Sequence, residues 1–168
     1  DPKLGPLADH GGPTQTMALL PGSPALNAGD SETCPVADQR GVPRPQGTAC
    51  DLGAYEQELP TVATAAATDL TPTGAVLHGT VNARHGDATV TFAYGLTASY
   101  GMTMTVPSVV TGTADVPVSA VLTGLTPNTT YHYRVVAVNA AGAAYGADAT
   151  FTTLAPPQHD LFLPSLRR

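Results

Sequence analysis

The stretch that decides the fold runs from Leu122 to Gly142 and reads LTGLTPNTTYHYRVVAVNAAG. Its second half alternates between apolar residues and the polar His132 and Arg134. One face of this segment collects Tyr131, Tyr133, Val135 and Ala137. A period of two residues predicts a half-buried β-strand, and the preceding Thr126-Pro127-Asn128 predicts a turn. The stretch therefore predicts a turn followed by a strand over residues 130–139.

The same alternation recurs on both sides of this stretch, with turn residues at short intervals between the alternating segments. Strands are expected near 62–68, 75–82, 88–95, 100–106, 117–123, 130–139 and 145–153. Many short strands separated by turns are typical of an antiparallel sandwich. The sequence therefore predicts an all-β fold with a seven-stranded sandwich over residues 62–155.

Residues 1–57 follow a different pattern, because they hold 8 of the 16 prolines and 8 of the 17 glycines. Proline fixes φ and removes a backbone donor, which excludes long helices and shortens strands. Strands are expected at Thr14–Leu20, Ala25–Ala28 and Ala49–Tyr55, with a helical turn around Met17–Leu20 as an alternative. The chain thus divides into an N-terminal region (1–57), a linker (58–61), the sandwich (62–155) and an extended tail (156–168).

The segment Leu122–Tyr131 resembles the E–F corner of fibronectin type III domains. The resemblance implies a tyrosine corner built from Tyr131, Leu125 and Pro127, in which the tyrosine hydroxyl bonds to the backbone just upstream. Further matching segments are Tyr133–Gly142, Phe92–Gly95 and Tyr100-Gly101.

The chain departs from that family in one respect, since it contains no tryptophan. Gly79 stands where the family buries a tryptophan. Phe92, Tyr94 and Tyr133 are therefore expected to fill the core.

Residues 1–57 resemble the C-terminal cap of secreted bacterial right-handed parallel β-helix proteins. The matching segments are Asp1–Leu7, Gly11–Thr14, Ala18–Ala25, Asp38–Pro45 and Cys50–Glu56. A β-helix cap packs its apolar side chains against the preceding coil, and no such repeats stand before this region in the sequence. The side chains that lack such a coil are Leu4, Leu7, Met17, Leu19, Leu20, Leu26, Leu52 and Tyr55. We expect them to contact the region itself, the sandwich or another molecule.

The tail carries the apolar segment Leu161-Phe162-Leu163, followed by the basic pair Arg167-Arg168. An unpaired strand can pair with another chain, and a contact that does not close into a ring builds a fibre. The residues predicted as subunit contacts are Leu4, Leu7, Leu19, Leu20, Leu161, Phe162 and Leu163. The expected partners are copies of this chain or other surface proteins.

The chain has two cysteines, Cys34 and Cys50, in the proline-rich region. A segment this poor in apolar residues needs a covalent link, so a disulfide is predicted, with two buried free thiols as the alternative. A disulfide implies an oxidising compartment, hence a secreted, extracellular or cell-surface location.

Composition excludes two classes of function. The formal net charge is −6 and Lys3 is the single lysine, so no basic surface for nucleic acid is expected. No apolar run approaches the roughly 20 residues that span a bilayer, so no transmembrane segment is expected.

Catalytic and metal-binding patterns are absent from the sequence. The five histidines (His10, His78, His85, His132 and His159) do not have metal-ligand spacing. Carboxylates that could bind calcium are Asp30, Glu32 and Asp51, although capping of turns is the alternative role.

Two further acids, Glu56 and Glu58, fall at the linker between the two regions. An Asp38–Arg40 pair is expected to order its loop, with ligand binding by Arg40 as the alternative. Asn128-Thr129-Thr130 matches the N-glycosylation pattern, or is a plain turn. No enzyme activity and no cofactor are predicted.

Three functions fit these observations. The first is an extracellular structural or adhesive protein, with self-assembly into a filament by strand or tail exchange. The second is an accessory module released from a secreted β-helix enzyme that acts on polysaccharides. The third is a carbohydrate-binding module, against which the lack of tryptophan counts, because sugar platforms favour exposed aromatic faces.

Overall fold

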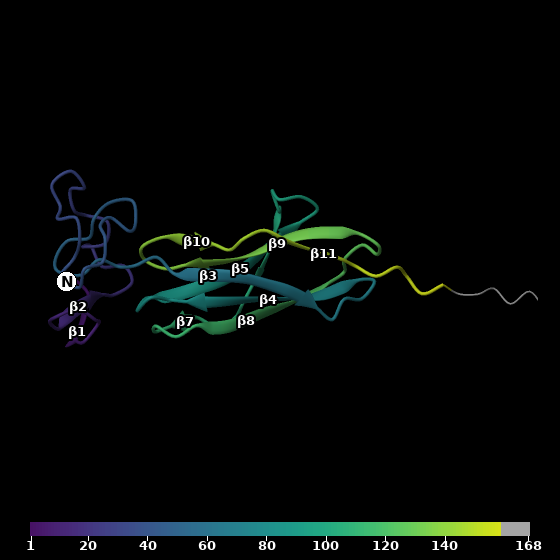
Figure 1. Ribbon diagram of the computed structural model, residues 1–168, viewed down its shortest axis with the longest axis horizontal. Coiled ribbons are helices and arrows are strands. Elements are labelled where there is room, and N and C mark those ends of the chain that lie inside the picture. The colour runs from purple at the N-terminus through teal and green to yellow at the C-terminus, as the bar shows by residue number, and fades with distance from the viewer. Residues whose placement is uncertain (159–168) are drawn as a thin grey trace, which may run out of the picture.

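The computed structural model describes residues 1–158, and the predicted contacts Leu161, Phe162 and Leu163 lie outside the described residues. The molecule is elongated (Figure 1), with the N-terminal region at one end and the exit of the chain after the last strand at the other. No helix that could span a membrane occurs in the described part of the chain.

Two antiparallel sheets form the sandwich, and the predicted fold class is confirmed. The smaller sheet has the order β3-β4-β8, built from Thr61–Thr68, Gly74–Asn82 and Val116–Thr123. The larger sheet has the order β10-β9-β5-β6, built from Ala143–Tyr145, Thr130–Val138, Asp87–Gly95 and Met102–Thr105. Two further strands extend this sheet: β11 (Ala149–Thr152) pairs with β9, and β7 (Val110–Thr111) pairs with β5.

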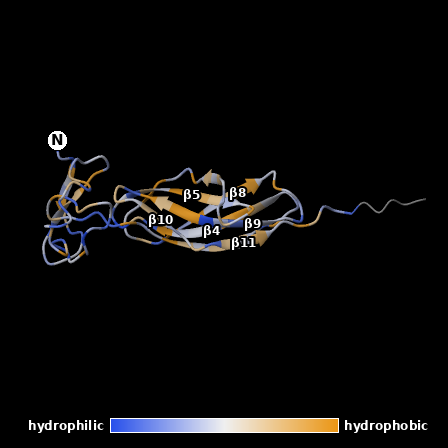
Figure 2. Cartoon of the chain, turned by 90° about the horizontal axis from the view of Figure 1, so that it is seen from above, coloured by the Kyte–Doolittle hydropathy of each residue, from blue (hydrophilic) through white to orange (hydrophobic). Residues whose placement is uncertain are grey.

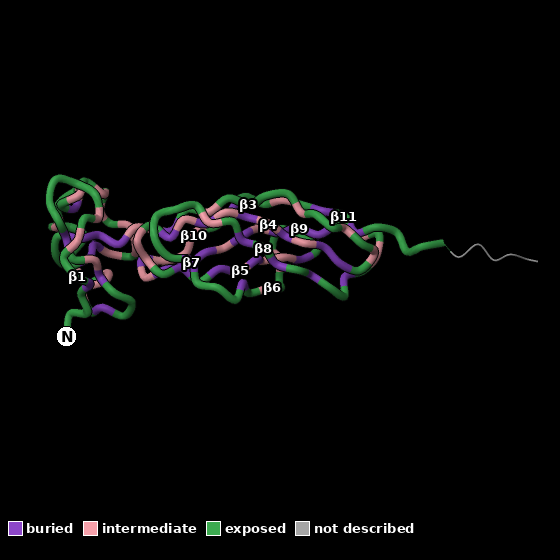
Figure 3. Tube along the Cα trace, turned by 90° about the horizontal axis from the view of Figure 1, so that it is seen from below, coloured by how far each residue is buried: buried purple, intermediate pink, exposed green. Residues whose placement is uncertain are grey.

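The core lies between the sheets, where the buried residues follow the central strands (Figure 3). The alternation predicted for β9 is confirmed, because Tyr131, Tyr133, Val135 and Ala137 are all buried. Gly79 lies opposite Val135, and a Cβ at position 79 would stand 3.1 Å from the Val135 Cβ. No tryptophan fits there, and Phe92 and Tyr133 instead supply fully buried rings. The expectation for Tyr94 was wrong in degree, since its side chain is only half-buried.

The corner before β9 is held by the side chain of Tyr131. Its hydroxyl accepts a hydrogen bond from the backbone N–H of Thr126 (3.1 Å), the arrangement that the resemblance implied. Leu125 is buried beside it. A second link joins the two sheets, because the Tyr133 hydroxyl donates to the Ala65 carbonyl at 2.7 Å.

The single strand expected over 145–153 is wrong, because two strands cover this stretch. Strand β10 pairs with residues 136–138 of β9, and β11 pairs with residues 130–133. Gly146 interrupts them, and its N–H donates to the Val135 carbonyl. A Cβ on Gly146 would overlap the Thr64 hydroxyl oxygen and lie 2.9 Å from the Val135 side chain, so the chain passes too close to β3 and β9 here to carry a side chain.

The N-terminal region contains a single two-stranded sheet, in which β1 (Leu4–Ala8) pairs with β2 (Thr16–Leu19). The helical turn proposed for Met17–Leu20 and the strands expected at Ala25–Ala28 and Ala49–Tyr55 were wrong. The latter two segments form turns and bends. Side-chain carboxylates accept the N–H groups of Asn27 and Asp51, and a single backbone bond, from Leu52 N–H to the Ala25 carbonyl, joins the two segments. The structure does not show a β-helix here, and the hydropathy of this end is mixed (Figure 2).

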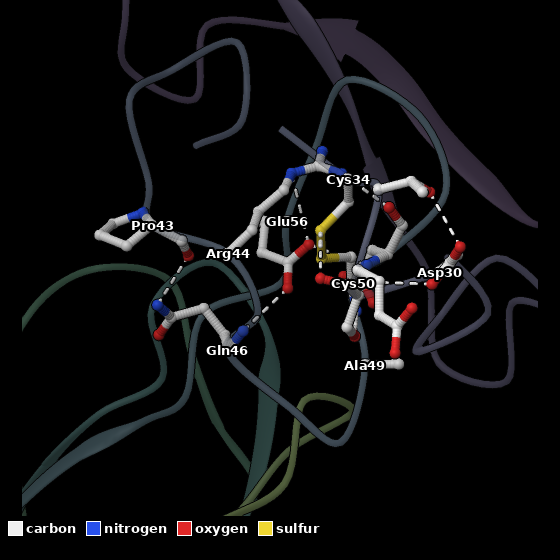
Figure 4. The surroundings of a disulfide bond; sticks show 12 residues. Asp30, Cys34, Pro43, Arg44, Gln46, Ala49, Cys50 and Glu56 are labelled. Atoms are coloured by element: carbon white, nitrogen blue, oxygen red, sulfur yellow. Dashed lines mark hydrogen bonds and ion pairs between the residues drawn. A yellow bond between two sulfur atoms is a disulfide. The ribbon is translucent and has the colours of Figure 1, made fainter. Parts of the chain in front are cut away.

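Cys34 and Cys50 form the predicted disulfide, which ties two loops of this region together. Figure 4 shows that it lies beside Asp30, Arg44 and Glu56. The backbone around it is also fixed, since Gly29 N–H donates to the Cys50 carbonyl at 2.8 Å. The covalent link joins segments that share no sheet.

Reducing this disulfide is expected to destabilise the N-terminal region while leaving the sandwich folded. The cysteines are 16 residues apart, and a loop of that size is worth about 3 kcal/mol in the chain-entropy model. Amide hydrogen exchange, measured with and without a thiol reductant, checks this. Exchange should rise throughout residues 1–57, and β4, β5 and β9, which contain no cysteine, serve as the internal control. Unchanged exchange around Cys50 would contradict the expectation.

Candidate functional site

A large apolar depression lies on the N-terminal region, and we call it the N-terminal groove. Its volume is ≈ 480 Å³. It is formed between the β1–β2 sheet and the loop that precedes the linker. The residues lining it are Pro2, Leu4, Leu7, Gln15, Thr16, Met17, Leu19, Ala25, Gln39, Leu52, Gly53, Ala54 and Tyr55.

The groove brings together three of the predicted contact residues, Leu4, Leu7 and Leu19. Leu7 is 58% exposed and Leu4 40% exposed. Leu19 is only 5% exposed, so it is covered by the chain itself, one of the expected outcomes, and offers little surface for a subunit contact. Leu20 lies away from the groove, beside the junction with the sandwich, and is exposed. The region thus partly covers its own apolar residues and leaves Leu4 and Leu7 open.

The strands beside the groove have unpaired edges. Within the described residues, β1 and β2 pair only with each other. Pro6 lies in β1 and has no N–H to donate, and the register of the pair shifts between Leu4 and Leu7. A proline and an irregular register make an edge a poorer template for another strand. A partner is therefore expected to bind this surface through side-chain contacts rather than through backbone pairing with β1 or β2.

The floor of the groove rests on a buried polar network rather than on an apolar core. Tyr55 is almost fully buried, and the guanidinium carbon of Arg40 lies 3.7 Å from its ring centroid. Burial raises the pKa of the Tyr55 hydroxyl, and the positive charge of Arg40 opposes this shift. Arg40 pairs with Asp38 at 2.7 Å, and both side chains are buried. The Asp38–Arg40 pair predicted from the sequence is confirmed, and its burial leaves Arg40 no free surface for a ligand.

Asp38 is the centre of this network. One of its carboxylate oxygens accepts the N–H groups of Arg40 (2.8 Å) and Val42 (3.0 Å). The other accepts Glu56 N–H (2.8 Å) and both Nε (2.9 Å) and a terminal nitrogen (2.7 Å) of Arg40. Burial works against ionisation, but these hydrogen bonds outweigh it and hold the pKa of Asp38 below its ordinary value. Such an acid stays charged at neutral pH.

Two further carboxylates, those of Glu56 and Asp51, also accept backbone N–H groups; capping was the alternative role expected for Asp51, whereas the role of Glu56 was not predicted. Glu56 was assigned to the linker, yet its side chain is buried and accepts the N–H groups of Gln46 (2.9 Å) and Asp51 (2.8 Å). Asp51 accepts the N–H groups of Asn27 and Gln57, both at 2.7 Å. Irregular backbone pairs with itself only in part, and buried carboxylates accept some of the remaining N–H groups. These acids hold loops in place.

The candidate calcium ligands are not gathered into one site. The carboxylate of Asp51 accepts hydrogen bonds from the N–H groups of Asn27 and Gln57. The carboxylate of Asp30 caps its own turn, because it accepts hydrogen bonds from the Glu32 N–H and the Thr33 hydroxyl. Among residues 1–158, no group of three or more His, Cys, Asp or Glu side chains could hold a metal ion. Turn capping is the role that the structure gives to Asp30.

Direct contacts join the N-terminal region to the sandwich. The Glu58 carbonyl accepts a hydrogen bond from the Asn139 side chain (2.7 Å), and its carboxylate lies 3.6 Å from Arg84. The rings of His10 and His85 meet edge to face, with centroids 5.5 Å apart. Burial, followed by the nearby His10, lowers the pKa of His85. The linker residue Glu58 therefore contacts the sandwich through Asn139 and Arg84, and its carboxylate also lies 3.6 Å from Arg40 of the N-terminal region.

A second polar cluster, on the outer face of the larger sheet, was not singled out from the sequence. It contains Tyr100, His132, Arg134, Tyr145 and Asp148. The outward direction of His132 and Arg134 was predicted, but their neighbours come from β10 (Tyr145) and from loops (Tyr100 and Asp148) that sequence spacing does not bring together.

Comparisons with known proteins give similarity in fold only. No protein-family model matches the chain, and no curated protein is similar to it in sequence. The sensor domain of the anti-sigma factor RsgI4 from Pseudobacteroides cellulosolvens is 24% identical and has a TM-score of 0.46. The match covers 58% of this chain and 96% of that one. A fibronectin type III domain of the human fibronectin type III domain containing protein 3 is 17% identical, with a TM-score of 0.41. That match covers 62% of this chain and 94% of the other. The fold class itself rests on the strand order and register.

Proposed function

We propose that this protein is a non-catalytic, extracellular structural or adhesive protein that associates with copies of itself. In this proposal, the N-terminal groove of one copy binds the apolar segment Leu161–Leu163 of the next copy. The observation that carries the proposal is the groove, because a folded protein that exposes grouped apolar side chains commonly uses them for contact. The disulfide supports the extracellular location.

The position of the tail favours binding between copies over binding within one copy. Strand β11 ends beside Thr130 at the start of β9, whereas the other end of β9 adjoins the linker through Asn139. The nine residues of β9 span about 30 Å. Residues 153–163, fully extended, would span about 38 Å, and the groove lies beyond the linker. To fill its own groove the tail would have to run back along the whole sandwich, whereas the groove of another copy does not impose this path.

Charge is consistent with this contact. Residues 1–158 contain five Lys or Arg against twelve Asp or Glu, whereas residues 159–168 contain two Arg against one Asp. The basic end of one copy would therefore approach an acidic body. Such attraction accelerates association and weakens as salt is added.

Substitutions on the two predicted surfaces test the proposal. Leu7→Asp places a charge in the groove, and Phe162→Asp places one in the tail. Each is expected to weaken self-association at least about tenfold, because burying an unpaired charge costs several kcal/mol. Analytical ultracentrifugation over a concentration series, together with negative-stain microscopy, measures this. Leu96→Asp is the matched control, since Leu96 is 61% exposed and lies in the β5–β6 loop.

Mixing the two variants gives the sharpest result. The Leu7→Asp protein keeps an intact tail and the Phe162→Asp protein keeps an intact groove. A mixture should therefore form one-to-one pairs that do not elongate. A wild-type protein that stays monomeric at every concentration would reject self-assembly and favour the alternative, an accessory module of a secreted β-helix enzyme whose coil covers the groove.

A further inference from the structure

The outer face of the larger sheet carries the polar cluster around Arg134 in the middle of β9. Because side chains alternate along a strand, His132 and Arg134 point away from the core that Tyr133 enters. On β5 the residues opposite them are small, with Gly95 paired to His132 and Ala93 to Arg134. This leaves room above the sheet for side chains that reach in from the loops.

Two tyrosines from those loops and strands hold the guanidinium group of Arg134. Its central carbon lies 4.7 Å from the ring centroid of Tyr100 and 4.4 Å from that of Tyr145. A cation near two aromatic rings is attracted to both, so its position is fixed. The donors of a guanidinium group lie in its plane, and contact with ring faces leaves them unused.

The nearby Asp148 makes no ion pair with Arg134. One carboxylate oxygen of Asp148 accepts the Tyr100 hydroxyl (3.0 Å), and the other lies 2.8 Å from Nδ1 of His132. The hydrogen bond with His132 is the main cause of the lowered pKa of Asp148, and the charge of Arg134 also contributes to it. Arg134 makes no ion pair with any residue of the described chain, and its Nε is buried without a hydrogen-bond partner. A buried donor without an acceptor is costly, and such a group calls for an explanation.

The backbone of Tyr100 is strained in a way that positions its ring. Its φ is 60°, a left-handed conformation that is uncommon for a bulky residue. The hairpin is closed so tightly that a Cβ on Gly95 would overlap the Tyr100 carbonyl oxygen. Strain of this kind is often found where a side chain must be presented to a ligand.

We propose that the Arg134 cluster binds a hexuronate unit of an acidic extracellular polysaccharide. Nε of Arg134 is buried, so its two terminal nitrogens are the donors that suit a planar carboxylate, which a guanidinium group binds through two parallel hydrogen bonds. Tyr145 is 58% exposed and offers apolar ring surface to the sugar. His132, Asp148 and the Tyr100 hydroxyl lie beside it and can hydrogen-bond sugar hydroxyls.

Strand β9, which carries His132 and Arg134, does not offer an edge for strand addition, whereas β10, which carries Tyr145, lies at the edge of the sheet. Strand β9 is paired with β5 on one side and with β10 and β11 on the other. It therefore has no free edge to which a peptide strand could add. The cluster presents a sheet face bearing side-chain groups, which suits a ligand recognised through its carboxylate and hydroxyls.

The test is an NMR titration of the ¹⁵N-labelled full chain with oligogalacturonate. A neutral galactose oligomer of equal length is the ligand control. Saturable shifts are expected at Tyr100, Arg134 and Tyr145 with the acidic oligomer and none with the neutral one. Arg134→Gln should weaken binding about tenfold or more. Arg134→Lys should fall between it and the wild type, because it keeps the charge and loses the paired geometry.

Arg84→Gln is the matched protein control, because it removes the same charge from an exposed arginine elsewhere. Its affinity should stay within about twofold of the wild type, since an exposed remote charge contributes little. The proposal is overturned if the acidic oligomer does not bind saturably, if the neutral oligomer binds equally, or if Arg84→Gln weakens binding as much as Arg134→Gln. The amide spectrum reports whether Arg134→Gln is folded, and Tyr145→Ala tests the same site without touching the arginine.

Discussion

Replacing Asp38 by alanine is expected to lower the free energy of unfolding of the N-terminal region by about 3–5 kcal/mol. The change leaves the buried Arg40 without its partner and also removes the acceptor of three backbone N–H groups, those of Arg40, Val42 and Glu56. Chemical denaturation followed by residue-resolved hydrogen exchange measures the loss. It should be confined to residues 1–57, while β4, β5 and β9 keep wild-type protection.

The matched control is Asp87→Asn, since Asp87 is exposed and exposed substitutions usually change stability by about 0.5 kcal/mol or less. The pH dependence gives an independent check. Because the folded pKa of Asp38 is lowered, its contribution to stability is present above the unfolded pKa of about 3.9 and is lost as the pH falls below it. This part of the acid sensitivity should vanish in the alanine variant. An equal loss in Asp87→Asn would contradict the assigned role.

Replacing Phe92 by alanine is expected to destabilise the sandwich by about 3–5 kcal/mol. Phe92 is fully buried on β5, and β5 lies between β6 and β9. The chain has no tryptophan, so few large rings fill the space between the sheets. Loss of one leaves a cavity that neighbours held in a sheet cannot close. Thermal and urea denaturation measure the change.

Leu96→Ala is the control for this substitution, because Leu96 is apolar but exposed in the next loop. It should alter stability by about 0.5 kcal/mol or less. In Phe92→Ala the rise in amide exchange should be largest in β4, β5 and β9, whereas in Asp38→Ala it should be confined to residues 1–57. Stability close to wild type in Phe92→Ala would mean that the two sheets do not depend on this ring.

The two regions of the protein are stabilised by different means. The sandwich buries Leu77, Val90, Phe92 and Val135 in regular sheets that satisfy their own backbone. The N-terminal region has little regular pairing and relies on a disulfide and buried carboxylates. Its apolar residues are therefore not all needed for folding. Leu4 and Leu7 remain open in the groove, where they are available for contact with another molecule.

The sequence by itself determined the sandwich and the disulfide. The alternation in β4, β5, β8 and β9 specifies which side chains are buried, because successive residues of a strand face opposite sides of the sheet. These strands were predicted within about a residue of their observed bounds. Two cysteines in a proline-rich region left few alternatives to the Cys34–Cys50 pair.

Tertiary structure alone decided the groove, the polar network and the Arg134 cluster. Asp38 and Glu56 are 18 residues apart, and Tyr100 and Asp148 are 48 apart, so no local pattern links them. In the N-terminal region the backbone is irregular and its N–H groups find acceptors only once the loops have packed. Periodicity reports which face of a strand is buried, but it contains no information about which distant carboxylate meets a buried N–H group. That depends on the path of the loops, which the tertiary contacts fix.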